Sequence, residues 1–252
     1  MPKAVKRRYA SPRRDEQARE TRLRIIRAAR ELFVTKGYGR TTLAEIAQEA
    51  AVAVETVYAA FGNKATLLRQ TWYVESRGDE EDVPLFERAE MQDILDEPDL
   101  ATRIRRHAAF VTATNRRMGP LTAALEGAAA SEPAAEEMLA EFSKRRLDVT
   151  TKYAKAAAAT GRLAVSQAEC RDVLFATMDG TLWRRLVIER GWSDERYADW
   201  LGSAWIAELV SSADAAQGPA GRHYPQSRRE EPHDTREADV VHGSEDTTAH
   251  ER

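Results

Sequence analysis

The sequence predicts an all-α protein with a three-helix N-terminal domain and a larger helical C-terminal domain. Apolar residues recur at helical spacing, glycines, prolines and capping residues separate the helical runs, and the alternation typical of strands is absent. The 252 residues, 42% hydrophobic and 31% charged, are ordinary for a soluble protein and leave room for two domains. We expect domains at 15–62 and 63–212, between a disordered basic arm (1–14) and a disordered tail (213–252), because both end segments are too polar to build a core.

The first domain is expected to open with a helix from about Asp15. Leu23, Ile26 and Phe33 recur at helical spacing, and Gly37 supplies the permissive residue expected just after a helix end. The outer face of this helix is mostly basic.

Two short helices and a longer one follow. Thr42 and Glu45 fit a capping box, in which each side chain satisfies a free backbone amide at a helix start. A third helix is expected over 53–60, and Gly62 stops it. Asn63 then suits the N-cap of a long fourth helix.

The fourth helix is expected to end near Gly78, and the second domain follows it. Pro84 is expected to start a short helix that reaches about Met91. Longer helices are expected at about 99–116, 119–130, 133–160, 167–190 and 193–212. The break between the first two of these is predicted from Gly119-Pro120.

Charge is distributed unevenly along the chain, although the net charge is only -3. Residues 1–69 hold fifteen Lys and Arg against seven Asp and Glu, whereas residues 70–252 hold twenty-three against thirty-four. A basic N-terminal region suits the phosphate backbone of a nucleic acid, and an acidic remainder would be repelled from it. A solvated basic helix face would explain the same asymmetry.

Residues 42–60 have the spacing of a helix-turn-helix, in which one helix crosses the DNA backbone and the next enters the major groove. The residue identities add to this spacing. The run from Thr41 to Ala47, then Ala50-Ala51-Val52, Thr56-Val57-Tyr58, Phe61 and the run from Asn63 to Leu68 follow a helix that ends in Glu31-Leu32-Phe33 and Lys36-Gly37-Tyr38. Over about residues 18–70 the sequence resembles the TetR family. The resemblance implies a homodimeric repressor whose larger helical domain binds a small effector.

Several residues are expected to contact double-stranded DNA. Thr42 can cap its helix or offer a hydroxyl to a phosphate, and both readings stay open. By resemblance, Thr56 and Tyr58 should touch DNA, although Tyr58 could instead be a core aromatic. The predicted contacts are Thr41, Thr42, Ala53, Glu55, Thr56, Tyr58 and Lys64, with Arg7, Arg8, Arg13 and Arg14 in the arm.

Two of these residues are predicted on physical grounds. Lys64 lies in the first turn of a helix, where a cation opposes the helix dipole, so a phosphate contact explains it better than helix stability does. Glu55 could accept a hydrogen bond from a cytosine amino group, or be a solvated acid at a helix end.

The third helix departs from the family pattern. Ala51 occupies the place of a turn glycine, Ala53 that of a capping hydroxyl, and Ala59 and Ala60 those of larger side chains. The helix therefore offers few groups that can reach bases. An arginine-rich arm in the adjacent minor groove is expected to compensate.

The second domain is expected to bind an effector and to dimerise. Aromatic and methionine side chains are candidates for the pocket, with core residues as the competing reading: Trp72, Tyr73, Phe86, Phe110, Met118, Phe142, Tyr153 and Met178. Residues 173–210 resemble the last two helices of TetR-type proteins, which form a dimer interface. Its expected apolar residues, with an intrachain core as the alternative, are Leu182, Trp183, Leu186, Val187, Trp200, Leu201, Trp205 and Leu209. His107, beside two arginines, is a candidate contact for an anionic ligand or part of a solvated face.

An enzyme is not expected. Cys170 is the only cysteine and has no neighbouring histidine, and the sequence contains no phosphate-binding loop or metal-ligand cluster, so no cofactor or metal is expected. No apolar run is long enough for a membrane span or signal peptide, which predicts a cytoplasmic protein. A transcriptional activator of the same fold, or a helical scaffold or adaptor, stays open.

Overall fold

Every described helix of this chain belongs to one compact unit. The computed structural model describes residues 12–79, 81 and 83–211. Arg7, Arg8 and the predicted tail lie outside the described residues. Among the described helices none is both long and apolar enough to cross a membrane.

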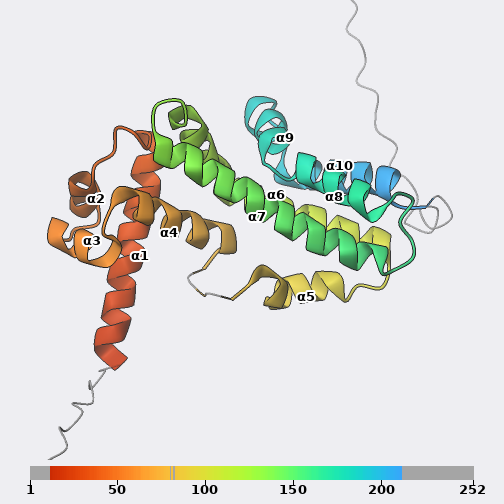
Figure 1. Cartoon of the computed structure of the whole chain (residues 1–252), viewed down its shortest axis with the longest axis horizontal. Coiled ribbons are helices and arrows are strands. Elements are labelled where there is room, and N and C mark those ends of the chain that lie inside the picture. The colour runs from red at the N-terminus through yellow and green to blue at the C-terminus, as the bar shows by residue number, and fades with distance from the viewer. Residues whose placement is uncertain (1–11, 80, 82, 212–252) are drawn as a thin grey trace, which may run out of the picture. The chain divides into compact units, whose positions relative to one another are not determined.

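The described residues are helical almost throughout, which confirms the all-α prediction (Figure 1). One isolated β-bridge joins Leu163 to Val210 within them. The helices are α1 (Pro12–Thr35), α2 (Leu43–Glu49), α3 (Val54–Phe61), α4 (Lys64–Arg77), η1 (Leu85–Glu87), α5 (Ala89–Leu95), α6 (Leu100–Ala128), α7 (Pro133–Ala158), α8 (Gln167–Thr177), α9 (Thr181–Trp183), η2 (Arg184–Glu189) and α10 (Asp194–Leu209).

Helices α1 to α3 pack around a small core that continues into α4. Phe33 from α1, Ile46 from α2 and Val57 from α3 have no exposed surface, and Phe61 is 4% exposed. Burying side chains of this size stabilises a domain by about 1.5–3 kcal/mol each. Three short elements are thereby held in a fixed mutual arrangement.

Helix α1 begins earlier than predicted. Its first residue is Pro12, so Arg13 and Arg14 lie in the first turn of a helix and not in a disordered arm. Proline suits this position because its fixed φ is helical and its missing N–H would be unpaired there. Both arginines remain exposed.

The predicted caps of α2 and α4 form. The Thr42 hydroxyl accepts from the Glu45 amide while the Glu45 carboxylate accepts from the Thr42 amide. Asn63 Oδ1 accepts from the Thr66 amide at 2.8 Å. Helix α4 ends at Gly78, whose φ of +82° lies in the left-handed region that favours glycine.

Helix α6 runs without a break through Pro120, so the predicted division into 99–116 and 119–130 is wrong. The ring of Trp183 covers this point, since a Cβ added to Gly119 would lie 2.7 Å from the Trp183 ring. Leu121 and Leu125, just beyond the proline, have no exposed surface. Tertiary contacts on both sides of Pro120 thus offset the lost backbone hydrogen bond.

The segment predicted as one helix over 167–190 is divided. Helix α8 ends at Thr177, and Gly180, with a φ of +87°, starts the short α9 and the widened turn η2.

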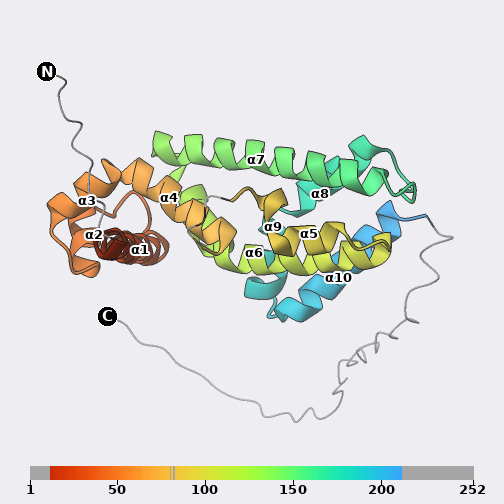
Figure 2. The ribbon, with the colours of Figure 1, turned by 90° about the horizontal axis from the view of Figure 1, so that it is seen from below.

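A second hydrophobic core lies between α9, η2, α10 and α6. Helix α7 runs alongside α6 (Figure 2). This core holds the helices that line the cavity described below.

Candidate nucleic-acid interface and cavity

Helices α2 and α3 form a helix-turn-helix. The turn between them is closed by the Val52 amide, which donates to the Ala47 carbonyl at 3.0 Å. Ala51 has a φ of +53°, which costs a non-glycine residue roughly 1–2 kcal/mol. The turn therefore has the left-handed backbone conformation that favours glycine, although the residue at this position is alanine.

The outward face of α3 is exposed. Tyr58 is 55% exposed, so the reading of Tyr58 as a core aromatic is wrong, and Phe61 fills the core at this end instead. Glu55 is exposed and Thr56 partly exposed. Ala53 occupies the N-cap position without a side-chain hydrogen bond. Glu55, Thr56 and Tyr58 are thus accessible on α3, and their contacts with DNA stay a prediction.

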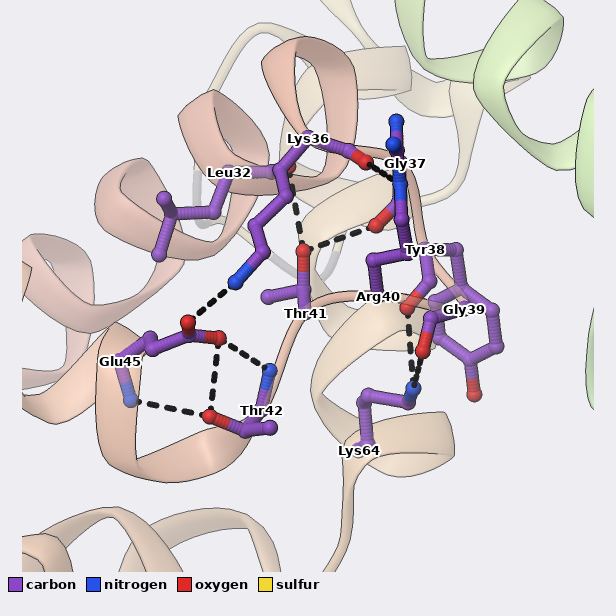
Figure 3. A network of polar contacts seen from close by, with 10 residues as sticks. All are labelled: Leu32, Lys36, Gly37, Tyr38, Gly39, Arg40, Thr41, Thr42, Glu45 and Lys64. Carbon is purple, nitrogen blue, oxygen red and sulfur yellow. Dashed lines mark hydrogen bonds and ion pairs between the residues drawn. The ribbon is translucent and has the colours of Figure 1, made fainter.

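Thr41 differs from its neighbour Thr42 (Figure 3). Thr41 is 1% exposed, and its hydroxyl donates to the carbonyls of Gly37 at 2.8 Å and Leu32 at 3.2 Å. We correct its predicted DNA contact, because this side chain ties the end of α1 to α2. Thr42 is exposed at the start of α2, with its hydroxyl in the capping box.

Lys64 has partners inside the chain. Its Nζ donates to the carbonyls of Tyr38 at 2.9 Å and Gly39 at 3.4 Å and lies 4.3 Å from the centre of the Tyr38 ring (Figure 3). These contacts offset the unfavourable helix dipole at this position. Contacts within the chain therefore also explain Lys64, and the phosphate contact stays a prediction.

Two cations that were not predicted from the sequence make contacts within the helix-turn-helix region. Arg22 donates to the Ala60 carbonyl at 3.2 Å and lies 4.5 Å from the centre of the Phe61 ring, so it stabilises the end of α3. Lys36 forms an ion pair with Glu45, which together with the bonds from Thr42 lowers the pKa of Glu45 to about 2. No local sequence signal could have predicted the role of Arg22, because its partners come from α3.

A cavity of about 910 Å³ lies in the second domain. It is bounded by α4, η1, α6, α7 and the end of α8, and six predicted ligand residues line it: Trp72, Phe86, Phe110, Met118, Phe142 and Met178. The other two predictions are corrected. The Tyr73 hydroxyl donates to Glu141 at 2.6 Å, and Tyr153 is buried beneath the His107 ring at a centroid distance of 3.8 Å.

Polar groups line the cavity among these apolar side chains. His107 is 1% and Asn115 5% exposed, and Arg146 is partly buried. Burial lowers the pKa of His107 to about 3, so its imidazole is neutral and the solvated-face reading is wrong. Asn115 and Arg146 were not predicted, although each is a polar residue near the apolar stripe of its helix.

Helix α4 connects the cavity to the helix-turn-helix. Trp72 of α4 stacks on Phe142 of α7 at 3.7 Å and lines the cavity. Glu75 of α4 accepts from Arg30 of α1 at 2.7 Å, and its carbonyl accepts from Arg117 of α6 at 3.1 Å. A shift of α4 would therefore be transmitted to α1.

The predicted dimer residues divide into two groups. Trp183, Leu201, Trp205 and Leu209 are at most 3% exposed within one chain, so their assignment to the interface is corrected to the intrachain core. Trp183 and Trp205 also donate from their indole nitrogens to Asp194 at 2.8 Å and Thr177 at 2.9 Å. The partly exposed residues are Leu182, Leu186, Val187 and Trp200.

Ile188 was not predicted as an interface residue; it follows Val187 on η2 and is 63% exposed. We use the name η2 surface for the five apolar side chains of α9, η2 and α10 that keep exposed area within one chain: Leu182, Leu186, Val187, Ile188 and Trp200.

Comparison with known proteins identifies the helix-turn-helix. Residues 25–71 match the family model of bacterial regulatory proteins, tetR family. Over 57 residues the chain is 47% identical to the HTH-type transcriptional regulator TtgR of Pseudomonas putida and equally to the probable HTH-type transcriptional regulator ArpR of the same species. Residues 25–71 are therefore similar to the N-terminal region of tetR-family regulators. Each match covers 23% of this chain and 27% of the relative, so the chain spans about a quarter of the curated relatives' length.

Several solved structures share the fold beyond this domain. NalD of Pseudomonas aeruginosa, the secondary repressor of the MexAB-OprM multidrug efflux pump, matches with a TM-score of 0.55 and 21% identity over 77% of this chain and 99% of its own. SmeT in complex with triclosan matches with 0.55 and 20% over 82% and 100%. A putative regulator from Saccharomonospora viridis in complex with choline matches with 0.57 and 17% over 77% and 99%. At these identities the likeness shows a shared fold.

Proposed function

We propose that this chain is a DNA-binding transcriptional regulator that acts as a homodimer and leaves its DNA when a small molecule fills the cavity. The observation that carries the proposal is the exposed Tyr58 on α3 of a TetR-type domain. Such a regulator would act in the cytoplasm, where its DNA is.

The proposed DNA contacts come from α3 and the surfaces beside it. Tyr58, Thr56 and Glu55 would face the major groove, while Thr42 at the start of α2 would meet a phosphate. The exposed Arg13 and Arg14, in the first turn of α1, add positive charge to the same N-terminal domain. Because neutralised phosphates release counterions, affinity should fall steeply as salt rises.

The η2 surface is the proposed dimer interface. It is apolar, partly exposed, and lies on the segment that resembles the last helices of TetR-type proteins. A two-fold dimer presents two copies of α3 to DNA one helical turn or more apart, which predicts a two-fold symmetric operator.

Release is proposed to pass through α4. Trp72 lines the cavity, while Glu75 two residues before the end of the helix bonds Arg30 of the DNA-binding domain, so a ligand that shifts α4 alters the spacing of the two α3 helices. The ligand must bind the two arrangements unequally. A coupling of about 1–3 kcal/mol would weaken DNA binding 5-fold to 150-fold.

Repression is favoured over activation by the structural relatives. NalD is described as a repressor, and SmeT was crystallised with triclosan, a small molecule. Purified protein should protect one two-fold symmetric site in the DNA flanking its gene, and that site should overlap the promoter. Protection upstream of a promoter with increased transcription would instead indicate an activator.

The same footprint tests the alternative hypothesis that the protein is a helical scaffold, and the chemistry of Cys170 bears on the hypothesis that it is an enzyme. A helical scaffold would prefer no duplex at about 0.15 M salt. Burial of Cys170 raises the pKa of its thiol to about 11, which argues against a nucleophilic role. No protection of any tested duplex by a folded dimer would contradict the proposed function.

A further inference from the structure

We propose that the effector is a hydrophobic organic anion whose acidic group binds between Asn115 of α6 and Arg146 of α7. The inference rests on the proposed function, in which the cavity holds the effector. It adds the chemical class of that molecule and the two side chains that would recognise its charge.

Asn115 and Arg146 lie at the same level of the cavity. His107 of α6 and Tyr153 of α7 face each other in a stack at 3.8 Å. Asn115 follows His107 by eight residues, and Arg146 precedes Tyr153 by seven. Because α6 and α7 are antiparallel and each residue rises about 1.5 Å, both positions lie roughly 11–12 Å from that stack.

Both side chains also lie near the turn that follows α8. Asn115 Oδ1 would be 3.5 Å from a Cβ added to Gly180. The Arg146 guanidinium lies over the ring of Phe175, which is near the end of α8. Two independent observations therefore place the amide and the guanidinium at one turn.

Each of the two side chains has a buried donor without a partner. Asn115 Nδ2 and Arg146 Nε are buried and make no hydrogen bond to any described residue. The Arg146 guanidinium lies 4.7 Å from the centre of the Phe175 ring, and this contact does not supply an acceptor for its Nε–H. A guanidinium stays charged at neutral pH, so the acceptor that suits it best carries a negative charge.

Three of the four carboxylates that line the cavity have partners other than Arg146. Glu126 pairs with Arg184 at 2.7 Å and Glu141 with Arg69 at 3.1 Å. Asp179 accepts from the amide and the hydroxyl of Thr181, both at 2.9 Å, and makes no ion pair with Arg146 within 4.0 Å among the described residues. The fourth lining carboxylate, Asp148, is exposed.

Apolar walls extend to both sides of this level. Met118 and Phe142 lie toward the DNA-binding domain, and Phe110 lies toward His107. A small inorganic anion would leave these walls uncovered. A molecule with an apolar, preferably aromatic, body and one carboxylate or sulfonate fits both parts of the cavity.

Two fluorescent probes with nearly the same aromatic body test the proposal on the full-length dimer. The dye 8-anilino-1-naphthalenesulfonate carries a sulfonate, and N-phenyl-1-naphthylamine lacks it. We expect the anion to bind wild-type protein roughly 10-fold to 100-fold more tightly than the neutral probe, as a charge-assisted contact implies.

Amino-acid substitutions test whether the preference for the sulfonate probe arises from the two cavity residues. Arg146→Met and Asn115→Leu should each lose most of the preference for the sulfonate while still binding the neutral probe. Lys155→Met removes the same charge from an exposed position of α7 outside the cavity lining and should keep it. Cooperative thermal unfolding and a wild-type near-ultraviolet circular dichroism spectrum show that a variant is folded, since apolar dyes also bind partly folded chains. If Arg146→Met does not fold, Asn115→Leu decides.

Three results would overturn the proposal: equal wild-type affinity for both probes, an unchanged preference in the folded cavity variants, or no binding of either probe. The operator footprint of the same wild-type sample separates the two hypotheses. A protein that protects its operator but fails the probe test keeps the proposed function and loses only the anion. If the protein passes the probe test but protects no duplex, the anion site is supported and the proposed function is contradicted.

Discussion

Two adjacent hydroxyl groups, those of Thr41 and Thr42, have different surroundings although the sequence presents them as a pair. The Thr41 hydroxyl is buried against two carbonyls, and that of Thr42 is exposed. Sequence could place Thr42 because a capping box is defined by residues three apart. It could not place Thr41, since the acceptors on Leu32 and Gly37 belong to the preceding helix and loop.

Replacing Thr41 by valine tests this distinction. Thr41→Val loses two hydrogen bonds inside the domain, so we expect the free energy of unfolding to fall by about 1–3 kcal/mol in urea titrations. DNA affinity of the folded protein should not change. Thr151→Val, which removes an exposed hydroxyl bonded to Leu147 of α7, is the control and should stay within about 0.5 kcal/mol. A loss of DNA affinity without loss of stability would restore Thr41 as a DNA contact.

His107 makes stability depend on pH. Its pKa is lowered from 6.5 to about 3 by burial, so between these values the unfolded chain binds a proton that the folded chain does not. Stability present above pH 6.5 is therefore lost as the pH falls toward 3. We expect the free energy of unfolding to drop by about 2 kcal/mol between about pH 7 and pH 5.

His107→Phe is the matched variant for this measurement, because a phenyl ring can stack on Tyr153 but cannot titrate. Its unfolding free energy should be nearly flat over the same range, which lies above the ordinary pKa of carboxyl groups. Equal slopes in the two proteins would contradict the assignment to His107.

At the scale of elements, helix ends near capping residues and glycines could be predicted, and the course of α6 could not. The caps at Thr42 and Asn63 and the stop at Gly78 depend on neighbouring residues only. The continuation through Pro120 depends on Trp183, sixty-three residues later. The cavity was predicted in large part because aromatic residues on amphipathic helices face inward. The sequence could not distinguish residues of the dimer interface from residues of the intrachain core, since the same apolar stripe on a helix suits either.

Two glycines of α6 test this account of the helix. A Cβ at Gly119 would lie 2.7 Å from the Trp183 ring, whereas one at Gly127 meets nothing within 4 Å. We expect Gly119→Ala to lower the unfolding free energy by about 1–3 kcal/mol through overpacking. Gly127→Ala should raise it by about 0.5–1 kcal/mol, because alanine favours a helix more than glycine does. Equal effects in thermal or urea unfolding would show that Trp183 does not press on α6.

At the scale of the whole molecule, the account requires two chains to meet through the η2 surface. Ile188→Asp places a charge on its most exposed apolar residue and should raise the dimer dissociation constant at least about tenfold in analytical ultracentrifugation. Leu147→Asp, at an exposed apolar position of α7, is the control and should leave the dimer intact. If only the control dissociates, the interface lies on α7.

The central claim is that α3 enters a DNA groove with Tyr58 at its outer face. Its most direct test is the affinity of Tyr58→Ala for the footprinted duplex at about 0.15 M salt, measured by fluorescence anisotropy beside Leu147→Ala as control. We predict that Tyr58→Ala loses at least about tenfold in affinity, as a lost groove contact implies, while its unfolding free energy stays within about 0.5 kcal/mol of wild type. A folded, dimeric Tyr58→Ala protein that binds this duplex as tightly as wild type would contradict the claim.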